Sequence, residues 1–114
     1  MTDLENMTDL EYVLDRVPLP ELLAQAAEEA IELAHAVLKL RRAHDPANPT
    51  PISKAAAAVQ LEEELSDLLL CLAMCLGQLG YSGEIDPCPQ GLMDYKLKRW
   101  ADRLRAQEED ADGQ

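Results

Sequence analysis

Apolar residues recur along this chain with helical spacing, and no stretch alternates as a β-strand does. One such set shares a single helix face: Leu22, Ala26, Leu33, Ala36 and Leu40. A second set, further along, has the same spacing: Ala57, Leu61, Leu68, Cys71, Cys75 and Leu79. Steps of three, four and seven residues place side chains along one stripe of an α-helix. The pattern therefore predicts two long amphipathic helices, each with an apolar seam.

Capping and helix-breaking residues set the limits of the first two helices. Thr8 or Asp9 can cap a short helix that runs to about Arg16. Two prolines over residues 18–20 end it, and the second of them suits the first turn of the next helix. We expect that helix to run from about residue 20 to residue 43.

A proline-rich break separates this helix from the rest of the chain. Three prolines lie between residues 45 and 51, and a helix cannot continue through them. Thr50 or Ser53 can cap a third helix, which we expect to end near residue 78 because Gly80 and Gly83 follow. A fourth helix is predicted over about residues 91–107, followed by an acidic tail.

The composition agrees with an all-α fold. Apolar residues make up 47% of the chain and are mostly Leu and Ala, which are strong helix formers, and there is no Phe. We predict an antiparallel helical bundle with three major helices and one short N-terminal helix. The whole chain, residues 1–114, is expected to form one domain with its core over about residues 18–107.

Charge and cysteine content restrict the possible partners and the compartment. The net charge of −12 disfavours nucleic-acid polymers, whose phosphates need a cationic surface. The three cysteines are odd in number and no signal-peptide pattern precedes them, so we expect reduced thiols in the cytoplasm. The longest apolar run covers residues 68–76, well short of the ~20 residues of a membrane span, so no membrane partner is expected.

Acidic residues interrupt both apolar seams. Glu29 lies within the first seam and Glu64 within the second. Glu32 and Asp67 follow three residues later, at the edge of each seam. Two helices joined by a short loop pack antiparallel, so the four carboxylates would face one another.

Four buried carboxylates need protons, solvent or cations to offset their repulsion. Clustered oxygen ligands suit a hard cation, Mg²⁺ or Mn²⁺. Taken singly, each acidic pair is typical of a solvated helix face. Two pairs that both interrupt a seam, on adjacent helices, favour a metal site.

These residues resemble a known family. Glu28-Glu29-Ala-Ile-Glu32 and Glu64-Leu-Ser-Asp67 are similar to the EExxE and ExxD motifs of the MazG-like, all-α nucleotide pyrophosphohydrolases. The similarity extends over residues 25–36, the loop at 48–51 and residues 98–104, within a matched stretch of about 20–105. The chain departs from the family in one respect, because the 31 residues between the two motifs exceed the usual gap.

The resemblance implies an enzyme that cleaves a nucleoside triphosphate to a monophosphate and pyrophosphate, as a homodimer or homotetramer. It implies that Glu29, Glu32, Glu64 and Asp67 bind Mg²⁺, with Mn²⁺ as a possible substitute. Glu28 is a candidate general base, although its position on the helix points away from the seam. The candidate substrate contacts are amide side chains: Gln25, Gln60 and Asn48.

The fourth helix offers positive charge. Lys96, Arg99 and Arg103 form one stripe on it and are candidates for binding the substrate's phosphates. The alternative is a solvated basic face. An apolar seam runs beside the stripe and consists of Met93, Leu97, Trp100 and Leu104. We expect Trp100 to lie in the core, with stacking on a nucleotide base as the alternative.

Two further patterns have simple interpretations. Glu32 and His35 match a Glu-x-x-His spacing, but di-iron bundles need two such motifs, so a surface histidine is favoured. Cys71 and Cys75 lie one turn apart without further soft ligands, which favours core packing.

Two rival functions stay open. One is a non-catalytic helical module that binds an identical chain or a partner helix. The other is a pyrophosphohydrolase for a specialised metabolite such as phosphoribosyl-ATP.

Overall fold

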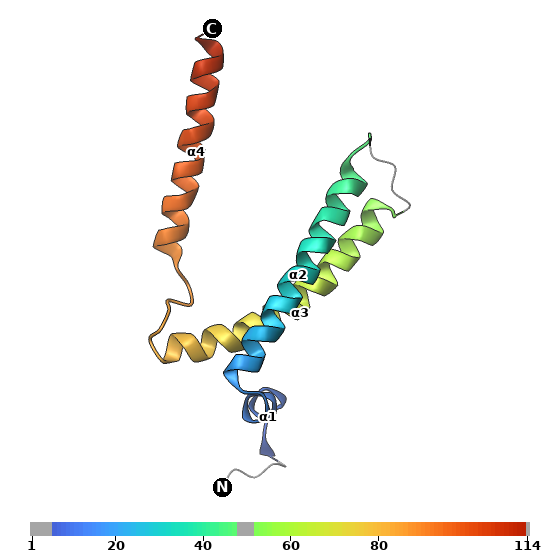
Figure 1. Cartoon of the computed structure of the whole chain (residues 1–114), viewed down its shortest axis with the longest axis vertical. Coiled ribbons are helices and arrows are strands. Elements are labelled where there is room, and N and C mark those ends of the chain that lie inside the picture. The colour runs from blue at the N-terminus through green and yellow to red at the C-terminus, as the bar shows by residue number, and fades with distance from the viewer. Residues whose placement is uncertain (1–5, 48–51, 114) are drawn as a thin grey trace.

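All the regular secondary structure in the residues that the structure describes is helical. A computed structural model describes residues 6–47 and 52–113, and Figure 1 shows the whole chain. The major elements are four α-helices: α1 (Asp9–Arg16), α2 (Leu19–His44), α3 (Lys54–Tyr81) and α4 (Gln90–Asp112). No strand occurs in the described part. The all-α prediction is confirmed.

The helix starts match the predicted caps. The Thr8 hydroxyl accepts a hydrogen bond from the Glu11 amide at 3.1 Å, and the Ser53 hydroxyl accepts one from the Ala56 amide at 3.1 Å. Each bond satisfies an amide that has no partner within its helix. Pro20 lies in the first turn of α2, where its missing N–H costs no helical bond.

Two helices end later than predicted. α3 passes through Gly80 and ends at Tyr81, before Gly83 adopts a positive φ of 78°. Gly80 faces Pro87 so closely that a Cβ there would lie 2.9 Å from the proline ring. The predicted acidic tail is also wrong in part, because α4 continues to Asp112. Residues 107–112 are mostly Gln, Glu and Ala, which favour a helix, and no breaker occurs before Gly113.

The predicted seams of α2 and α3 pack against each other. Figure 1 shows the two helices side by side. Within the described part of the chain, α2 and α3 contact each other more extensively than any other pair of helices. A buried cluster of Leu22, Ala26, Cys71 and Cys75 joins them, and Leu14 and Val17 from the α1 end pack on it. Both cysteines therefore serve as core residues, as predicted, and burial raises the pKa of each thiol.

The fourth helix stands apart from this pair. α4 projects away from α2 and α3 beyond the 82–89 connection (Figure 1). The radius of gyration is 20.2 Å, whereas a compact chain of this length has ~13 Å. Trp100 is 65% exposed, so its predicted place in the core is wrong for a single chain. The bundle core within one chain is thus an α2–α3 pair extended by α1.

Among the described residues, one helix is apolar enough to cross a membrane by length and composition alone. An 18-residue window within α3 has a mean hydropathy of 1.2. Only 17% of that window is buried, so much of the apolar surface of α3 is open in a single chain. The expected cytoplasmic, membrane-free location stays a prediction.

Candidate metal centre

Three carboxylates from two helices converge beside the core. Glu29 of α2 and Glu64 and Asp67 of α3 each offer one oxygen, and these oxygens lie within 4.8 Å of one another. Glu64 and Asp67 are three residues apart, so they share one side of α3. The packing of the two seams brings Glu29 against that side. The structure therefore confirms that the two motifs meet in space.

The three acids lie at the rim of the packed interface. Glu29 and Glu64 are half-buried, whereas Asp67 is exposed to solvent. One helical turn away, Ala26 precedes Glu29 and Cys71 follows Asp67, and both of these are buried. The cluster thus has an apolar floor and an open side through which an ion and its ligands can enter.

The electrostatics of the cluster centre on Glu29. Partial burial raises the pKa of its carboxyl, and the neighbouring charges of Asp67, Glu64, Glu32 and Glu28 raise it further. No ion pair involving the three clustered acids occurs in the described residues. Uncompensated like charge at a half-buried position is what a bound cation would relieve.

The donor set fits a hard divalent cation. Mg²⁺ prefers oxygen ligands at ~2.0–2.1 Å, so two ligands on opposite sides of one ion lie ~4.2 Å apart. The three carboxylate oxygens lie within 4.8 Å of one another, so the widest pair would have to close by up to ~0.6 Å to reach that span. All donors are carboxylate oxygens, which suits Mg²⁺ or Mn²⁺ rather than a soft metal.

Two predicted acids lie outside this group of three. Glu32 and Glu28 are exposed on α2 and are not part of the converging set. Their charges still contribute to the raised pKa of Glu29, so both are near it. Glu32 therefore lies beside the cluster, and its predicted role as a direct ligand stays a prediction.

The structure adds a basic residue that the sequence analysis missed. The Lys39 ammonium of α2 donates a hydrogen bond to the Gln60 side-chain oxygen of α3 at 3.3 Å. Lys39 follows Glu32 by seven residues and Gln60 precedes Asp67 by seven, which is two helical turns or ~10 Å along each axis. This pair bridges the two helices on the side that carries the acids. The spacing of seven residues between Glu32 and Lys39 is the sequence signal that could have identified Lys39.

A separate apolar cavity lies about one helical turn from the cluster, and none of the three acids lines it. Gln25 is exposed and lines a cavity of 360 Å³ together with Cys71 and Met74. Burial, then the charge of Glu29, raises the pKa of the Cys71 thiol, which places that side chain close to the acids. Gln25 and Gln60 thus lie on either side of the carboxylates along the helix pair. Asn48 lies outside the described residues.

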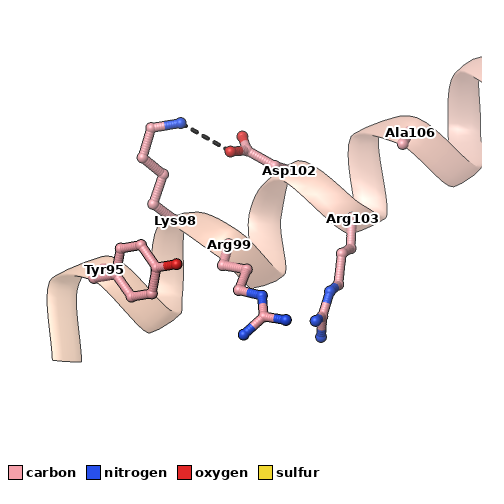
Figure 2. A pocket seen from close by; sticks show the side chains of 6 residues that line it. All are labelled: Tyr95, Lys98, Arg99, Asp102, Arg103 and Ala106. Carbon is pink, nitrogen blue, oxygen red and sulfur yellow. Dashed lines mark hydrogen bonds and ion pairs between the residues drawn. The ribbon is translucent and has the colours of Figure 1, made fainter. Parts of the chain in front are cut away.

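The predicted phosphate-binding residues occupy α4, away from the acids. Figure 2 shows the side chains of Arg99 and Arg103 on one side of the helix. Both residues line a shallow hollow of 500 Å³. Among the described residues neither arginine has an ion pair, whereas Asp102 pairs with Lys98 at 2.8 Å and with Arg105 at 3.2 Å. Lys96 is also exposed. One chain therefore does not bring this stripe to the carboxylates, and its role stays a prediction.

His35 is exposed, as predicted for a surface histidine.

Comparison with known proteins leaves the family open. The chain matches no protein-family model, and no curated protein or solved structure proved similar to it. The resemblance of its two acidic motifs to the MazG-like enzymes therefore stays a prediction, and the geometry of the carboxylates is the basis for a functional proposal.

Proposed function

We propose that this chain binds Mg²⁺ and hydrolyses a nucleoside triphosphate to a monophosphate and pyrophosphate. The observation that carries the proposal is the convergence of Glu29, Glu64 and Asp67 within 4.8 Å, without a cationic partner among the described residues. The order of the acidic motifs along two paired helices, and their resemblance to the MazG-like enzymes, select the reaction.

The chain's own residues have distinct tasks in this proposal. Glu29, Glu64 and Asp67 would hold the metal ion, which would supply charge neutralisation for the phosphate oxygens and polarisation of a water molecule. Glu28, near Glu29 and outside the converging group, is the candidate to accept a proton from the attacking water, and Glu32 stays a candidate fourth ligand. Lys39, on the same side of the helix pair, can attract the departing pyrophosphate.

Pyrophosphate release tests the proposal directly. We expect release from at least one member of a panel of canonical and modified NTPs and dNTPs with Mg²⁺ or Mn²⁺, and none with EDTA. Nucleoside monophosphate should appear in equal amount, because cleavage between the α and β phosphates yields one of each. Release of inorganic phosphate and a diphosphate instead would contradict the proposed bond cleavage.

The same panel separates the rival functions. A non-catalytic helical module is favoured by the large exposed apolar surface of α2, α3 and α4, and it would release no pyrophosphate and show no metal-dependent stabilisation. A pyrophosphohydrolase for a specialised metabolite would be stabilised by metal yet inactive on the panel, and phosphoribosyl-ATP is then the next substrate to test.

The raised pKa of Glu29 predicts how stability depends on pH. In the folded protein the pKa of this carboxyl lies above its ordinary value of 4.5, so the carboxyl keeps its proton to a higher pH than in the unfolded chain. Metal-free protein should therefore lose stability as the pH rises from ~4.5 through the raised pKa. Stabilisation by Mn²⁺ should grow over the same interval, because only the ionised carboxylate binds metal.

Thermal unfolding at stepped pH, with EDTA or Mn²⁺, measures both effects. Glu29→Gln should flatten the pH dependence in EDTA, and Glu62→Gln, on the exposed side of α3, should retain it. An unchanged slope in Glu29→Gln would show that another group is responsible.

A further inference from the structure

One side of the α2–α3 pair carries two matching lines of side chains. A step of seven residues is two helical turns, so residues at this spacing form a line along one side of a helix, ~10 Å apart. The two helices run in opposite directions (Figure 1), so the order of residues in one line is reversed in the other. The two lines are Gln25, Glu32 and Lys39 on α2, and Gln60, Asp67 and Met74 on α3.

Three kinds of chemistry follow one another along these lines. At one end the half-buried Lys39 donates a hydrogen bond to Gln60. The carboxylates of Glu29, Glu64 and Asp67 lie in the middle. The apolar cavity of 360 Å³ lies beyond them, at the end away from Lys39. A nucleoside triphosphate has the same order of parts, because its α phosphate lies between the terminal phosphates and the nucleoside.

The cavity has the size and lining of a site for a small, mostly apolar group. Its volume falls within the ~300–1,000 Å³ of small-molecule sites. Leu70 and Met74 of α3 and Val13 of α1 give it apolar walls, and a thioether such as that of Met74 contacts aromatic rings favourably. Gln25 adds an amide that can both donate and accept a hydrogen bond. Apolar walls with one such amide suit a nucleobase, which has apolar faces and a polar edge.

One ligand can reach both the cavity and the carboxylates. Gln25 precedes Glu29 by four residues and Cys71 follows Asp67 by four, which is ~6 Å along each helix axis. Cys71 lines the cavity, and the charge of Glu29 contributes to the raised pKa of its thiol. The ribose of a nucleotide bridges a gap of this order between its base and its α phosphate. The reverse orientation would place charged phosphates against apolar walls, which is costly.

We propose that the substrate lies along this side of α2 and α3, with its nucleobase in the cavity beside Gln25 and Leu70 and its terminal phosphates toward Lys39. The inference rests on the proposed function. It adds the direction of the bound nucleotide and the residues that recognise each end of it.

Binding calorimetry in Mn²⁺ tests this direction with ligands that contain one end or both. The probes with both ends are α,β-methylene-ATP and α,β-methylene-CTP, in which carbon replaces the oxygen at the proposed cleavage point. AMP and CMP lack the terminal phosphates, and inorganic tripolyphosphate lacks the base.

Two variants should affect different probes. Leu70→Ala should weaken binding of the triphosphate analogues and the monophosphates ~10-fold and leave tripolyphosphate unchanged, because it removes an apolar wall of the base site. Lys39→Gln should weaken binding of the triphosphate analogues and tripolyphosphate ~10-fold and leave the monophosphates unchanged, because it removes a charged hydrogen-bond donor.

Matched variants localise the effects. Leu69 is 55% exposed, against 62% for Leu70, but it does not line the cavity, and Lys54 is exposed at the start of α3. Leu69→Ala and Lys54→Gln should therefore keep the parent's affinity for every probe. Leu70 also lines a neighbouring hollow of 540 Å³, whereas Gln25 does not. Gln25→Ala should weaken the same probes as Leu70→Ala, by a few-fold.

The outcomes separate this inference from the proposed function. If the parent protein binds neither triphosphate analogue, the proposed function fails and the inference fails with it. If the parent binds them and Leu70→Ala and Lys39→Gln weaken the same probes, weaken none, or show the reversed pattern, the direction proposed here is wrong and the function stands. Equal thermal unfolding of all variants without ligand confirms that the fold is unchanged.

Discussion

Replacing Glu64 with glutamine is expected to abolish metal-dependent pyrophosphate release. Glutamine keeps the size of the side chain but removes a charge that, in the proposed site, would hold a cation next to Glu29 and Asp67. Loss of a residue that only supports a metal ligand costs ~10–100-fold in affinity or activity, so loss of a ligand should cost more than ~100-fold. Turnover at saturating Mn²⁺, together with metal binding by calorimetry, measures the effect.

The fold should survive this change. Glu64 is one of the charges that raise the pKa of Glu29, so its neutralisation relieves repulsion within the cluster. Without metal, Glu64→Gln should unfold at the same temperature as the parent protein or higher, and added Mn²⁺ should no longer raise that temperature. This combination separates a lost ligand from a lost fold.

Glu62→Gln is the matched control for Glu64→Gln. It makes the same change of charge in the same helix, two residues earlier and on the opposite, exposed side of α3. It should retain the parent's turnover and metal-induced stabilisation. If both variants were equally active, Glu64 would not be a ligand; if both were equally inactive, the net charge of α3 rather than a site would matter.

Leu22→Ala is expected to produce the largest loss of stability. Leu22 is 1% exposed, and it lies in the cluster where α2 meets Cys71 and Cys75 and where the α1 end packs. Truncating a buried leucine leaves a cavity and costs ~2–5 kcal/mol. Small domains are stable by only ~5–15 kcal/mol, so this change should remove a large share of the total.

Denaturant unfolding followed by circular dichroism measures this loss. Leu23→Ala is the control, because the neighbouring leucine is 44% exposed and should cost far less. Protein concentration must be the same for all variants, since association stabilises the folded state. A similar loss in both variants would show that Leu23 is covered in the assembled protein, and no loss in Leu22→Ala would refute the core described above.

The amino-acid sequence by itself determined the helices and the meeting of the acids. Caps at Thr8 and Ser53 and the proline break act within a few residues, so local patterns predict them. The seams follow from helical periodicity, and a short connection between two amphipathic helices leaves antiparallel packing as the simple solution. Glu29, Glu64 and Asp67 occupy seam or seam-edge positions, so their convergence followed from the same periodicity.

The tertiary structure decided what periodicity leaves open. Periodicity gives the side of a helix on which a residue lies, but it does not give the distance between two helices or the presence of a partner. For this reason Glu32 proved to lie outside the converging group, and the contact of Lys39 with Gln60 went unpredicted. The apolar stripe that includes Trp100 was correctly placed on one face of α4, yet only the arrangement of the helices shows that its own chain leaves that face exposed. An apolar stripe in the sequence indicates that one face of a helix must be buried, whereas the fold decides which surface covers that face.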